Sequence, residues 1–304
     1  MDSTARILGE IWFVNVGQGD CTLAVDHLTR KAILVDCPSW AVEAVARLIE
    51  NEAMQLDTAL VTHWDLDHYG GLARLSKRFL PRVVAYNHDT LFPDGPTNSG
   101  KFIRTTLQQF LDLVPHGVEL CSAEDGRGDV LGHLGWSLLA PTHDELTRAY
   151  IAQQRNIASA VLELRLGGTR VLVGGDAVAS TWRRLLDQQR LGPVEILRWP
   201  HHGASLHGDR DWSVGQRVLD SVNPRHVVVS VGTHNNHHHP NPDVVTRASK
   251  LCDLACTQKT QRCLDARGQG SPQPRSSPRE GRPCGGTMRL TVASDLTTFQ
   301  LNAS

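Results

Sequence analysis

Residues 58–71 read TALVTHWDLDHYGG. The first four letters form a short apolar run of the kind that makes a buried strand. The run leads directly into a segment with four side chains that can bind a metal ion: His63, Asp65, Asp67 and His68. Imidazole nitrogens and carboxylate oxygens are ligands of divalent metal ions. The segment therefore predicts a metal site at a strand end in preference to an exposed polar loop.

The spacing of these side chains brings several of them to one side of the chain. In an extended segment alternate residues share a face, so His63, Asp65 and Asp67 point the same way. Gly70 and Gly71 follow them, and glycines allow the loop to close tightly before a helix begins. We therefore expect the loop to gather its ligands around one point.

Asp176 follows another apolar strand, predicted at 170–173, and two glycines. A single aspartate after a strand most often caps a turn or a helix. Here Gly174 and Gly175 would let the backbone approach the site closely, and a carboxylate can bridge two metal ions. Asp176 is therefore a candidate ligand.

Two adjacent histidines, His201 and His202, end a strand predicted at 195–199. Paired histidines in isolation are weak evidence for a site. Gly203 beside them indicates a constrained turn that aims an imidazole. We therefore expect this turn to contribute to the same centre.

The rest of the chain alternates strands and helices in two similar halves. Further strands are predicted at 11–16, 22–25, 32–35, 81–86, 137–140, 160–166, 226–231, 288–292 and 297–301. Helices are predicted at 40–50, 72–79, 102–113, 180–189 and 241–251. The segment 87–100 is predicted as a loop, and the segment 258–286, rich in Arg, Pro, Ser and Gly, as a flexible loop. The order indicates an α/β fold with two packed sheets flanked by helices, in one domain over 1–304.

The composition limits the class of protein. Hydrophobic residues make up 40% of the 304 residues and charged residues 21%, which is typical of a globular chain with a sizeable core. The net charge of -1 argues against binding nucleic acid by bulk electrostatics. No apolar run approaches the roughly 20 residues that cross a bilayer, and the N-terminus lacks signal-peptide features. We expect a cytoplasmic protein with no membrane partner.

The seven cysteines do not indicate a disulfide framework in a chain of this length. Cys21, Cys37 and Cys121 stand in apolar surroundings and are predicted to be buried thiols. The other four lack the paired CxxC spacing of a zinc ribbon: Cys252, Cys256, Cys263 and Cys284. Free thiols are favoured over a structural metal there, although the role of these four stays open.

In their order along the chain, these segments resemble the metallo-β-lactamase superfamily, and more narrowly the hydrolase domain of ComEC-type DNA-uptake proteins, here expected as a stand-alone domain. The similar pieces span roughly residues 10 to 250: NVGQGD at 15–20, ILVD at 33–36, THWDLDHYGG at 62–71, NIASAVL at 156–162, VGGD at 173–176, WPHHG at 199–203, and SVG at 230–232 leading to His239 and Pro240. The resemblance implies a four-layer αββα sandwich with a two-metal cleft along one sheet edge.

The resemblance also implies which residues bind the ions: His63 and Asp65 the first, Asp67, His68 and His202 the second, and Asp176 both. We expect His201 to contact the substrate or transfer a proton, and the roles of His201 and His202 can be exchanged. His201 and Asp67 are the residues that we expect catalysis to require. Asp20 and Asp36 are candidates for orienting the ligands from behind, or are ordinary turn carboxylates.

Two departures from the family pattern concern the first metal ion. Asp65 stands where the commoner motif has histidine, and Asn156 stands where another histidine usually supplies a third ligand. The first site is thus oxygen-rich, so that Mn²⁺ becomes an alternative to Zn²⁺ for the two divalent ions. Asn156 and His239 are predicted to line the substrate cleft.

A pair of divalent ions can activate a water molecule for hydrolysis of phosphodiesters or of carbonyl compounds. The ComEC-like motifs and the oxygen-rich first site favour a phosphodiesterase or nuclease that acts on nucleic acid or a nucleotide. A lactonase or β-lactamase-like carbonyl hydrolase is the second hypothesis, and a non-catalytic regulatory module with a metal cleft is the third. The sequence does not set the physiological substrate, the native metal, the oligomeric state or the pathway.

Overall fold

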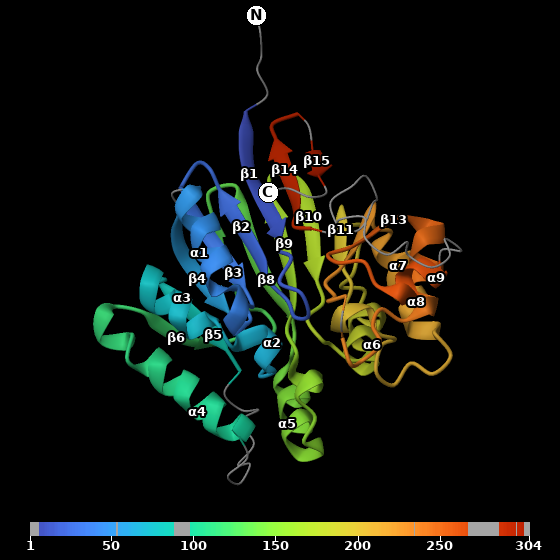
Figure 1. Cartoon of the computed structure of the whole chain (residues 1–304), viewed down its shortest axis with the longest axis horizontal. Coiled ribbons are helices and arrows are strands. Elements are labelled where there is room, and N and C mark those ends of the chain that lie inside the picture. Colours follow the sequence, from blue (N-terminus) through green and yellow to red (C-terminus); the bar gives the residue numbers. More distant parts are fainter. Residues whose placement is uncertain are drawn as a thin grey trace, which may run out of the picture.

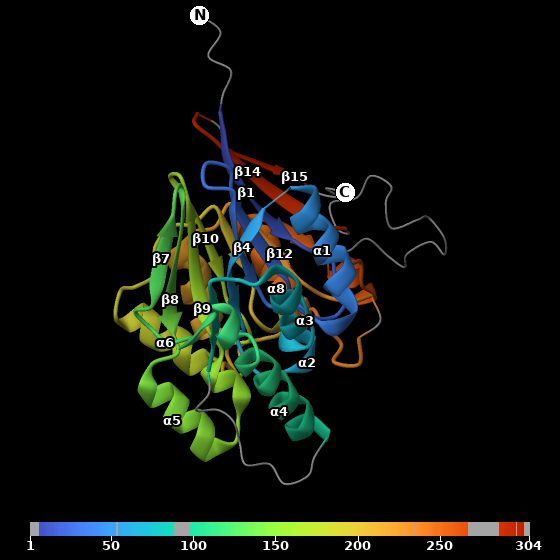
Figure 2. The ribbon, with the colours of Figure 1, turned by 90° about the vertical axis from the view of Figure 1, so that its left-hand side faces the viewer.

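The computed structural model describes residues 6–52, 54–87, 98–233, 235–266, 286–295 and 297–300. Two β-sheets lie face to face at the centre of the molecule, and helices cover their outer faces (Figure 1, Figure 2). This is the α/β sandwich that the sequence predicts, with four layers in the order αββα. No helix in the described part of the chain is long and apolar enough to cross a bilayer.

The first sheet has eight strands and joins the two ends of the chain. Across the sheet the strands are β15 (Thr297–Gln300), β14 (Met288–Ala293), β1 (Ile7–Phe13), β2 (Thr22–Asp26), β3 (Lys31–Val35), β4 (Gln55–Leu60), β5 (Val83–Tyr86) and β6 (Glu119–Ser122). β14 runs antiparallel to β1, with Met288 opposite Phe13. The closing strands therefore complete the N-terminal sheet.

The second sheet has seven strands from the middle of the chain. Across the sheet they are β13 (Asp253–Cys256), β12 (His226–Val229), β11 (Ile196–Arg198), β10 (Thr169–Val173), β9 (Val161–Leu166), β8 (Leu134–Ala140) and β7 (Gly128–Leu131). β10, β11 and β12 are parallel. Their C-terminal ends consequently open at the same edge.

Alternation along the strands builds the core between the sheets. On β1, Ile11 and Phe13 are fully buried in the cluster between the sheets, together with Leu164 and Val171 of the second sheet. Trp12, between them in sequence, faces the helices instead. Each sheet is therefore apolar on both faces and needs a helical layer outside it.

Helices of the described part of the chain form the outer layers. The first sheet is covered by α1 (Val42–Asn51), α3 (Leu72–Phe79) and α4 (Asn98–Leu111), and the second by α6 (Ala179–Asp187), α7 (Ser213–Val222) and α8 (Pro242–Leu251). α1 buries Val42, Val45, Ala46 and Ile49, which share one helical face. α3 has the bounds that the sequence predicts, 72–79.

Several elements were absent from the prediction: β6, β7, β13, α5 (His143–Ala152) and α7. The three strands have four residues each and depend on neighbours distant in sequence. α5 carries a readable signal, because Thr142 and Glu145 form a capping box at its start. In α7, Gly215 interrupts the helical pattern.

Part of the predicted loop at 258–286 is helical. α9 (Gln261–Ala266) begins where the Thr260 hydroxyl accepts a hydrogen bond from the Cys263 amide at 3.1 Å, and Cys263 packs into the core of the second half. Burial of this side chain in an apolar cluster favours order over a mobile loop. Residues 267–285 lie outside the described residues, and the single domain over 1–304 stays a prediction.

Candidate metal centre

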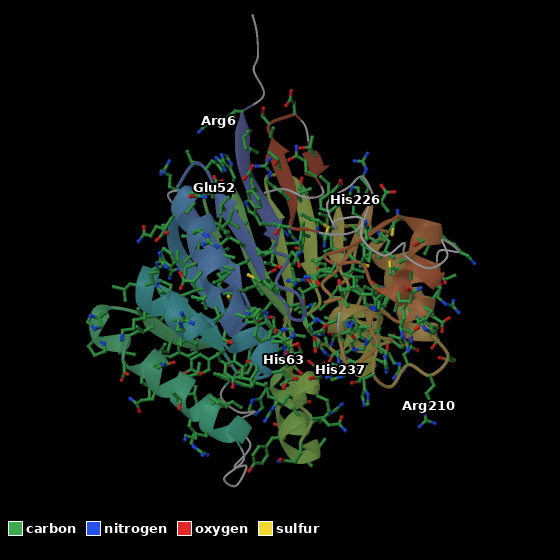
Figure 3. All side chains as sticks on the ribbon, viewed as in Figure 1. Arg6, Glu52, His63, Arg210, His226 and His237 are labelled. Atoms are coloured by element: carbon green, nitrogen blue, oxygen red, sulfur yellow. The ribbon has the colours of Figure 1, made fainter. Side chains whose placement is uncertain are left out.

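Loops from one end of both sheets supply the candidate site. The loop after β4, with the short helix α2 (Leu66–Tyr69), carries the histidine motif, the turn after β10 carries Asp176, and a 3-10 turn, η4 (His201–Gly203), follows β11. Figure 3 shows His63 and His237 at this end of the sandwich. The parallel strand ends thus bring together side chains that lie more than 100 residues apart.

We define the first ligand group as His63, Asp65 and Asp176. His63 Nε2 lies 3.3 Å from Asp65 Oδ2 and 3.5 Å from Asp176 Oδ2. The side chain of Asp65 is 39% exposed, whereas His63 and Asp176 are buried. The predicted ligands of the first ion therefore meet around one point, with Asp65 on the open side.

We define the second ligand group as Asp67, His68, His202 and Asp176. His202 Nε2 lies 3.3 Å from Asp67 Oδ2 and 3.4 Å from His68 Nε2. Asp176 Oδ1 lies 3.5 Å from His68 Nε2. Asp176 therefore turns one carboxylate oxygen toward each group, as the bridging role predicted from the family requires.

Hydrogen bonds to the other ring nitrogen orient the three imidazoles. His202 Nδ1 lies 3.2 Å from the Ser230 carbonyl oxygen and His68 Nδ1 lies 2.8 Å from Asp36 Oδ2. His63 Nδ1 lies 3.1 Å from the Thr62 hydroxyl. A carbonyl and a carboxylate only accept, so Nδ1 of His202 and of His68 carries a proton in these bonds, and Nε2 of each ring faces the centre.

Asp36 stands directly behind the histidine loop. Its carboxylate accepts hydrogen bonds from the Thr62 amide at 2.8 Å, the Thr62 hydroxyl at 2.6 Å and His68 Nδ1 at 2.8 Å. Asp36 thus contacts both the loop and the candidate ligand His68, and its ligand-orienting role stays a prediction.

Asp20 stands behind the other side of the second group. Asp20 Oδ1 lies 2.8 Å from an Arg198 guanidinium nitrogen and 3.5 Å from His202 Nδ1. Arg198 is 1% exposed and also donates to the Thr22 and Ser230 hydroxyls. Arg198 was not predicted as a site residue, although an arginine inside an apolar strand is itself a sign of a buried charge network.

Close backbone approaches explain two glycines of the motifs. A Cβ on Gly19, whose φ is +119°, would lie 2.5 Å from the Asp67 carbonyl oxygen, and the Asp20 amide donates to that oxygen at 3.1 Å. A Cβ on Gly203, whose φ is +85°, would lie 2.6 Å from Pro240 Cβ. Only glycine allows these loops to pack so tightly against the site.

The charges of the site act strongly on one another. Burial lowers the pKa of His68, but Asp176 and Asp36 outweigh it and raise that pKa to about 10. For Asp65 and Asp67, burial raises the pKa, and the neighbouring histidines hold it well below its ordinary value. The carboxylates therefore create a negative potential that attracts cations.

His201 and His239 lie at the mouth of the site. His201 Nε2 is 3.8 Å from Asp176 Oδ2 and its side chain is 30% exposed, whereas His202 is buried. The His239 ring lies 5.5 Å from the His201 ring. This geometry favours His202 over His201 in the second ligand group, and the substrate-binding role of His239 stays a prediction.

The 3-10 turn η3 (Arg155–Ala158) lies beside the first ligand group. The half-buried Asn156 makes no side-chain hydrogen bond to the described residues, so its substrate-binding role stays a prediction without support from a contact. Arg155 reaches the group instead, with a guanidinium nitrogen 3.3 Å from Asp65 Oδ1. The Ser159 hydroxyl accepts the Asp176 amide at 2.7 Å. Sequence reasoning gave neither Arg155 nor Ser159 a role, although Ser159 belongs to a quoted motif.

Comparison with known proteins identifies the family of this chain. The sequence profile described as "Metallo-beta-lactamase superfamily" matches residues 14–234. The chain belongs to the metallo-β-lactamase superfamily. Its fold is that of the metal-dependent hydrolases of this superfamily.

Two curated relatives agree with the ComEC-like motifs. The chain is 28% identical over 240 residues to Recombination protein 2 of Haemophilus influenzae and 24% identical over 258 residues to ComE operon protein 3 of Bacillus subtilis. These alignments cover 77% and 78% of this chain but 26% and 30% of the relatives, so it spans less than a third of their lengths. The predicted resemblance is confirmed.

Among solved structures, a variant of the β-hydroxylase CmlA superposes with a TM-score of 0.50 at 14% sequence identity. The alignment covers 82% of this chain and 52% of CmlA. This is a likeness of fold alone.

The superfamily fold implies divalent metal ions, and the side chains of this member fit them. His63 Nε2 and Asp176 Oδ1 are buried and have no hydrogen-bond partner in the described part of the chain. His68 Nε2 and His202 Nε2 face each other at 3.4 Å. Leaving the His63 and Asp176 atoms without a partner is costly, and cations in both ligand groups would remove that cost.

The thiols of the described cysteines do not belong to these ligand groups. Cys21, Cys37 and Cys121 are buried, as predicted, and Cys252 is half-buried. Cys256 Sγ lies 3.7 Å from Cys263 Sγ. No cysteine joins a potential metal-binding cluster within the described residues, and Cys284 lies outside them.

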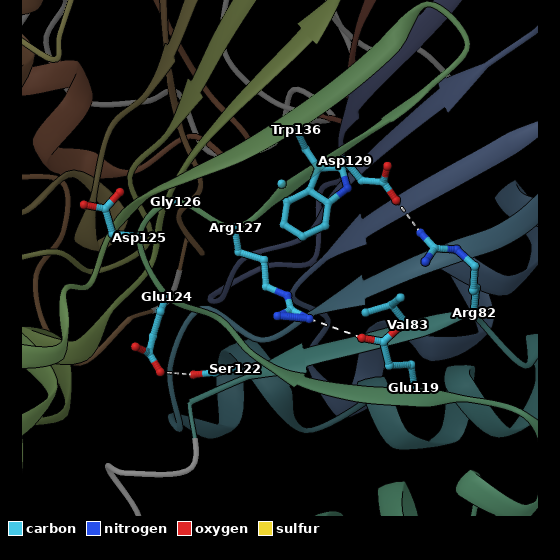
Figure 4. Close-up of a pocket in the computed structure, with 11 residues that line it drawn as sticks. Arg82, Val83, Glu119, Ser122, Glu124, Asp125, Gly126, Arg127, Asp129 and Trp136 are labelled. Atoms are coloured by element: carbon cyan, nitrogen blue, oxygen red, sulfur yellow. Dashed lines mark hydrogen bonds and ion pairs between the residues drawn. The ribbon is translucent and has the colours of Figure 1, made fainter.

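A cavity of about 740 Å³ opens elsewhere, between the edge strands β6 and β7 (Figure 4). No histidine or cysteine lines it. Its charged side chains pair with each other, as Arg127 does with Glu119 at 3.2 Å and Arg82 with Asp129. This cavity therefore lacks the ligand chemistry of the histidine cluster.

Proposed function

We propose that this protein is a metal-dependent phosphodiesterase or nuclease that cleaves nucleic acid or a nucleotide and uses two divalent ions, Zn²⁺ or Mn²⁺. The observation that carries the proposal is the position of Asp176, whose two carboxylate oxygens reach two separate ligand groups. A site for two adjacent ions suits in-line displacement at phosphorus, because both the attacking and the leaving oxygen must be stabilised.

When bound, the ions supply an activated water molecule and stabilise negative charge on the phosphoryl oxygens. The side chains of the protein orient the ligands and transfer protons. His63, His68 and His202 hold fixed Nε2 positions through their Nδ1 hydrogen bonds. We propose that His201, which is half-buried and 3.8 Å from Asp176, transfers a proton to the leaving oxygen. Asp67, in the second ligand group, is proposed as indispensable for turnover.

The chemistry of the first ligand group supports a phosphodiester over a carbonyl substrate. It contains one imidazole and two carboxylates, a set that accepts hard ions such as Mn²⁺. The name of one relative, Recombination protein 2, refers to a process of nucleic acids. Both observations favour a phosphoryl substrate.

The test is a substrate panel on purified protein. Bis-p-nitrophenyl phosphate, single-stranded DNA and nitrocefin are each incubated with Mn²⁺ or Zn²⁺, and metal per chain is determined by elemental analysis. We expect cleavage of the diester and of DNA, and loss of both in Asp67→Ala, while the exposed control Asp187→Ala keeps wild-type rates. Turnover of nitrocefin alone would establish a carbonyl hydrolase, and metal binding with no turnover of any substrate would establish a non-catalytic module.

A further inference from the structure

The side chains of the site differ in their exposure to solvent. His63, His68 and His202 are at most 4% exposed. The side chains that reach solvent include Asp65 and His201, at 39% and 30%, and Arg155, at 21%. A substrate must therefore approach between these exposed groups, and Arg155 is the permanent cation among them.

Arg155 is delivered to this position by a well-anchored segment. The Ala158 carbonyl accepts a hydrogen bond from the Asn87 side chain at 2.9 Å, and the Ala160 amide donates to the Thr62 carbonyl at 3.0 Å. Between them, the Ser159 hydroxyl holds the Asp176 amide. The turn that carries Arg155 is thus tied to the ligand loops themselves, so the guanidinium is preorganised beside the first ligand group.

Asp65 contacts the Arg155 guanidinium and remains part of the first ligand group. Its Oδ1 faces the Arg155 nitrogen at 3.3 Å and its Oδ2 faces His63 Nε2 at 3.3 Å. The carboxylate can therefore serve a metal ion and Arg155 at once. This arrangement places a planar cation next to any phosphoryl group bound at the first ion, and the geometry of a guanidinium matches phosphate oxygens.

The charge balance gives Arg155 a specific consequence. Five carboxylates of the described residues surround the centre: Asp20, Asp36, Asp65, Asp67 and Asp176. Arg198 is buried behind Asp20 and does not reach the substrate side. Removal of Arg155 makes the substrate side more negative by one charge, which disfavours an anionic substrate.

We infer that Arg155 sets the preference of this site for anionic phosphoryl substrates, because its guanidinium, held by Asp65, binds a phosphoryl oxygen. This inference rests on the proposed phosphodiesterase function. It separates Arg155 from the metal ligands: the ligands serve any hydrolysis at this centre, whereas Arg155 acts only where the substrate carries a negative charge.

The experiment compares two substrates with one leaving group, the anion bis-p-nitrophenyl phosphate and the neutral triester diethyl p-nitrophenyl phosphate. The variants are Arg155→Ala, Arg155→Lys and, as the control with the same charge change, Arg148→Ala on the exposed face of α5. Metal per chain and the dissociation constant of inorganic phosphate are measured for each Mn²⁺-loaded protein.

A hydrogen bond to a charged group contributes enough that we expect Arg155→Ala to lower kcat/KM for the anion by roughly 10- to 100-fold. Phosphate binding weakens in the same variant, while neutral-triester turnover and metal content stay at the Arg148→Ala level. Arg155→Lys recovers part of the loss because it keeps the charge.

The outcomes separate the two proposals. A wild-type protein that cleaves no diester overturns the proposed function. If the wild type cleaves the diester, the inference about Arg155 alone is overturned by any of three results: equal diester rates in Arg155→Ala and Arg148→Ala, unchanged phosphate binding, or loss of bound metal in Arg155→Ala.

Discussion

The two ligand groups that share Asp176 differ in what stands behind them. In the second group, Asp36 holds His68 and the buried pair of Asp20 and Arg198 lies against His202. In the first group, a hydroxyl holds His63, and Asp65 is partly exposed and paired with Arg155.

Charged partners in a buried setting orient an imidazole and strengthen it as a ligand. From this difference we expect the second group to have the larger effect on metal affinity, and the first group to have the larger effect on the choice of metal and substrate.

Removal of a second-group imidazole is expected to have the largest effect. In His68→Ala, diester turnover falls to background and the metal content per chain drops, because His68 Nε2 faces both Asp176 and His202. The exposed His116→Ala is the matched control. Circular dichroism should show a folded chain in both. Wild-type turnover in His68→Ala would remove the second group from the site.

Arg198→Met is expected to destabilise the fold, because it leaves the Asp20 carboxylate buried without its cation. Breaking a buried pair from one side costs about 3–5 kcal/mol. Chemical denaturation of the metal-free protein measures this change, and Asp20→Asn in the same chain should restore part of it.

The surface pair of Arg217 and Asp187 supplies the control for this measurement. Exposed pairs contribute less than about 1 kcal/mol, so Arg217→Met should unfold close to the wild type. An Arg198→Met protein as stable as Arg217→Met would show that the second group is not supported by this buried pair.

Asp36→Asn tests the orientation of His68 with little change of shape. Asp36 has a φ of +57°, a conformation that asparagine also tolerates. Loss of a carboxylate behind a ligating imidazole typically weakens metal binding about 10- to 100-fold. Chelator competition with Zn²⁺ measures the affinity, and an unchanged value would mean that Thr62 alone orients the loop.

Asp65→His is expected to have the smallest effect, and it concerns the first group only. A second imidazole there favours Zn²⁺ over Mn²⁺, so we expect the ratio of the two affinities to shift by about tenfold or less. Paired titrations with both ions measure that ratio. If Asp65→His changed the affinity ratio equally at the site that binds its ion most tightly, the two groups would not have the separate roles that we expect.

The sequence was most informative where chemistry is local. The four candidate ligands after β4 lie within six residues, and this composition is unusual for an ordinary loop. The α3 boundaries follow from helical periodicity that 72–79 carries by itself. Short elements such as β13 were missed because their stability comes from neighbouring strands.

Contacts between distant segments required the coordinates. Arg155 and Asp65 are 90 residues apart, and Arg198 and Asp20 are farther apart still. Their sequence surroundings do not indicate a partner. The same holds for β14 and β15, whose pairing beside β1 depends on the closure of the whole sheet.

From the order of its residues alone, this protein's sandwich architecture and its candidate metal-binding side chains were predictable, because alternation, periodicity and ligand chemistry act over a few positions. Folding in three dimensions decided that Asp176 faces two groups, that His202 is buried while His201 is partly exposed, and that Arg155 contacts Asp65. These outcomes depend on which strand ends meet at one edge, a consequence of packing two complete sheets against each other.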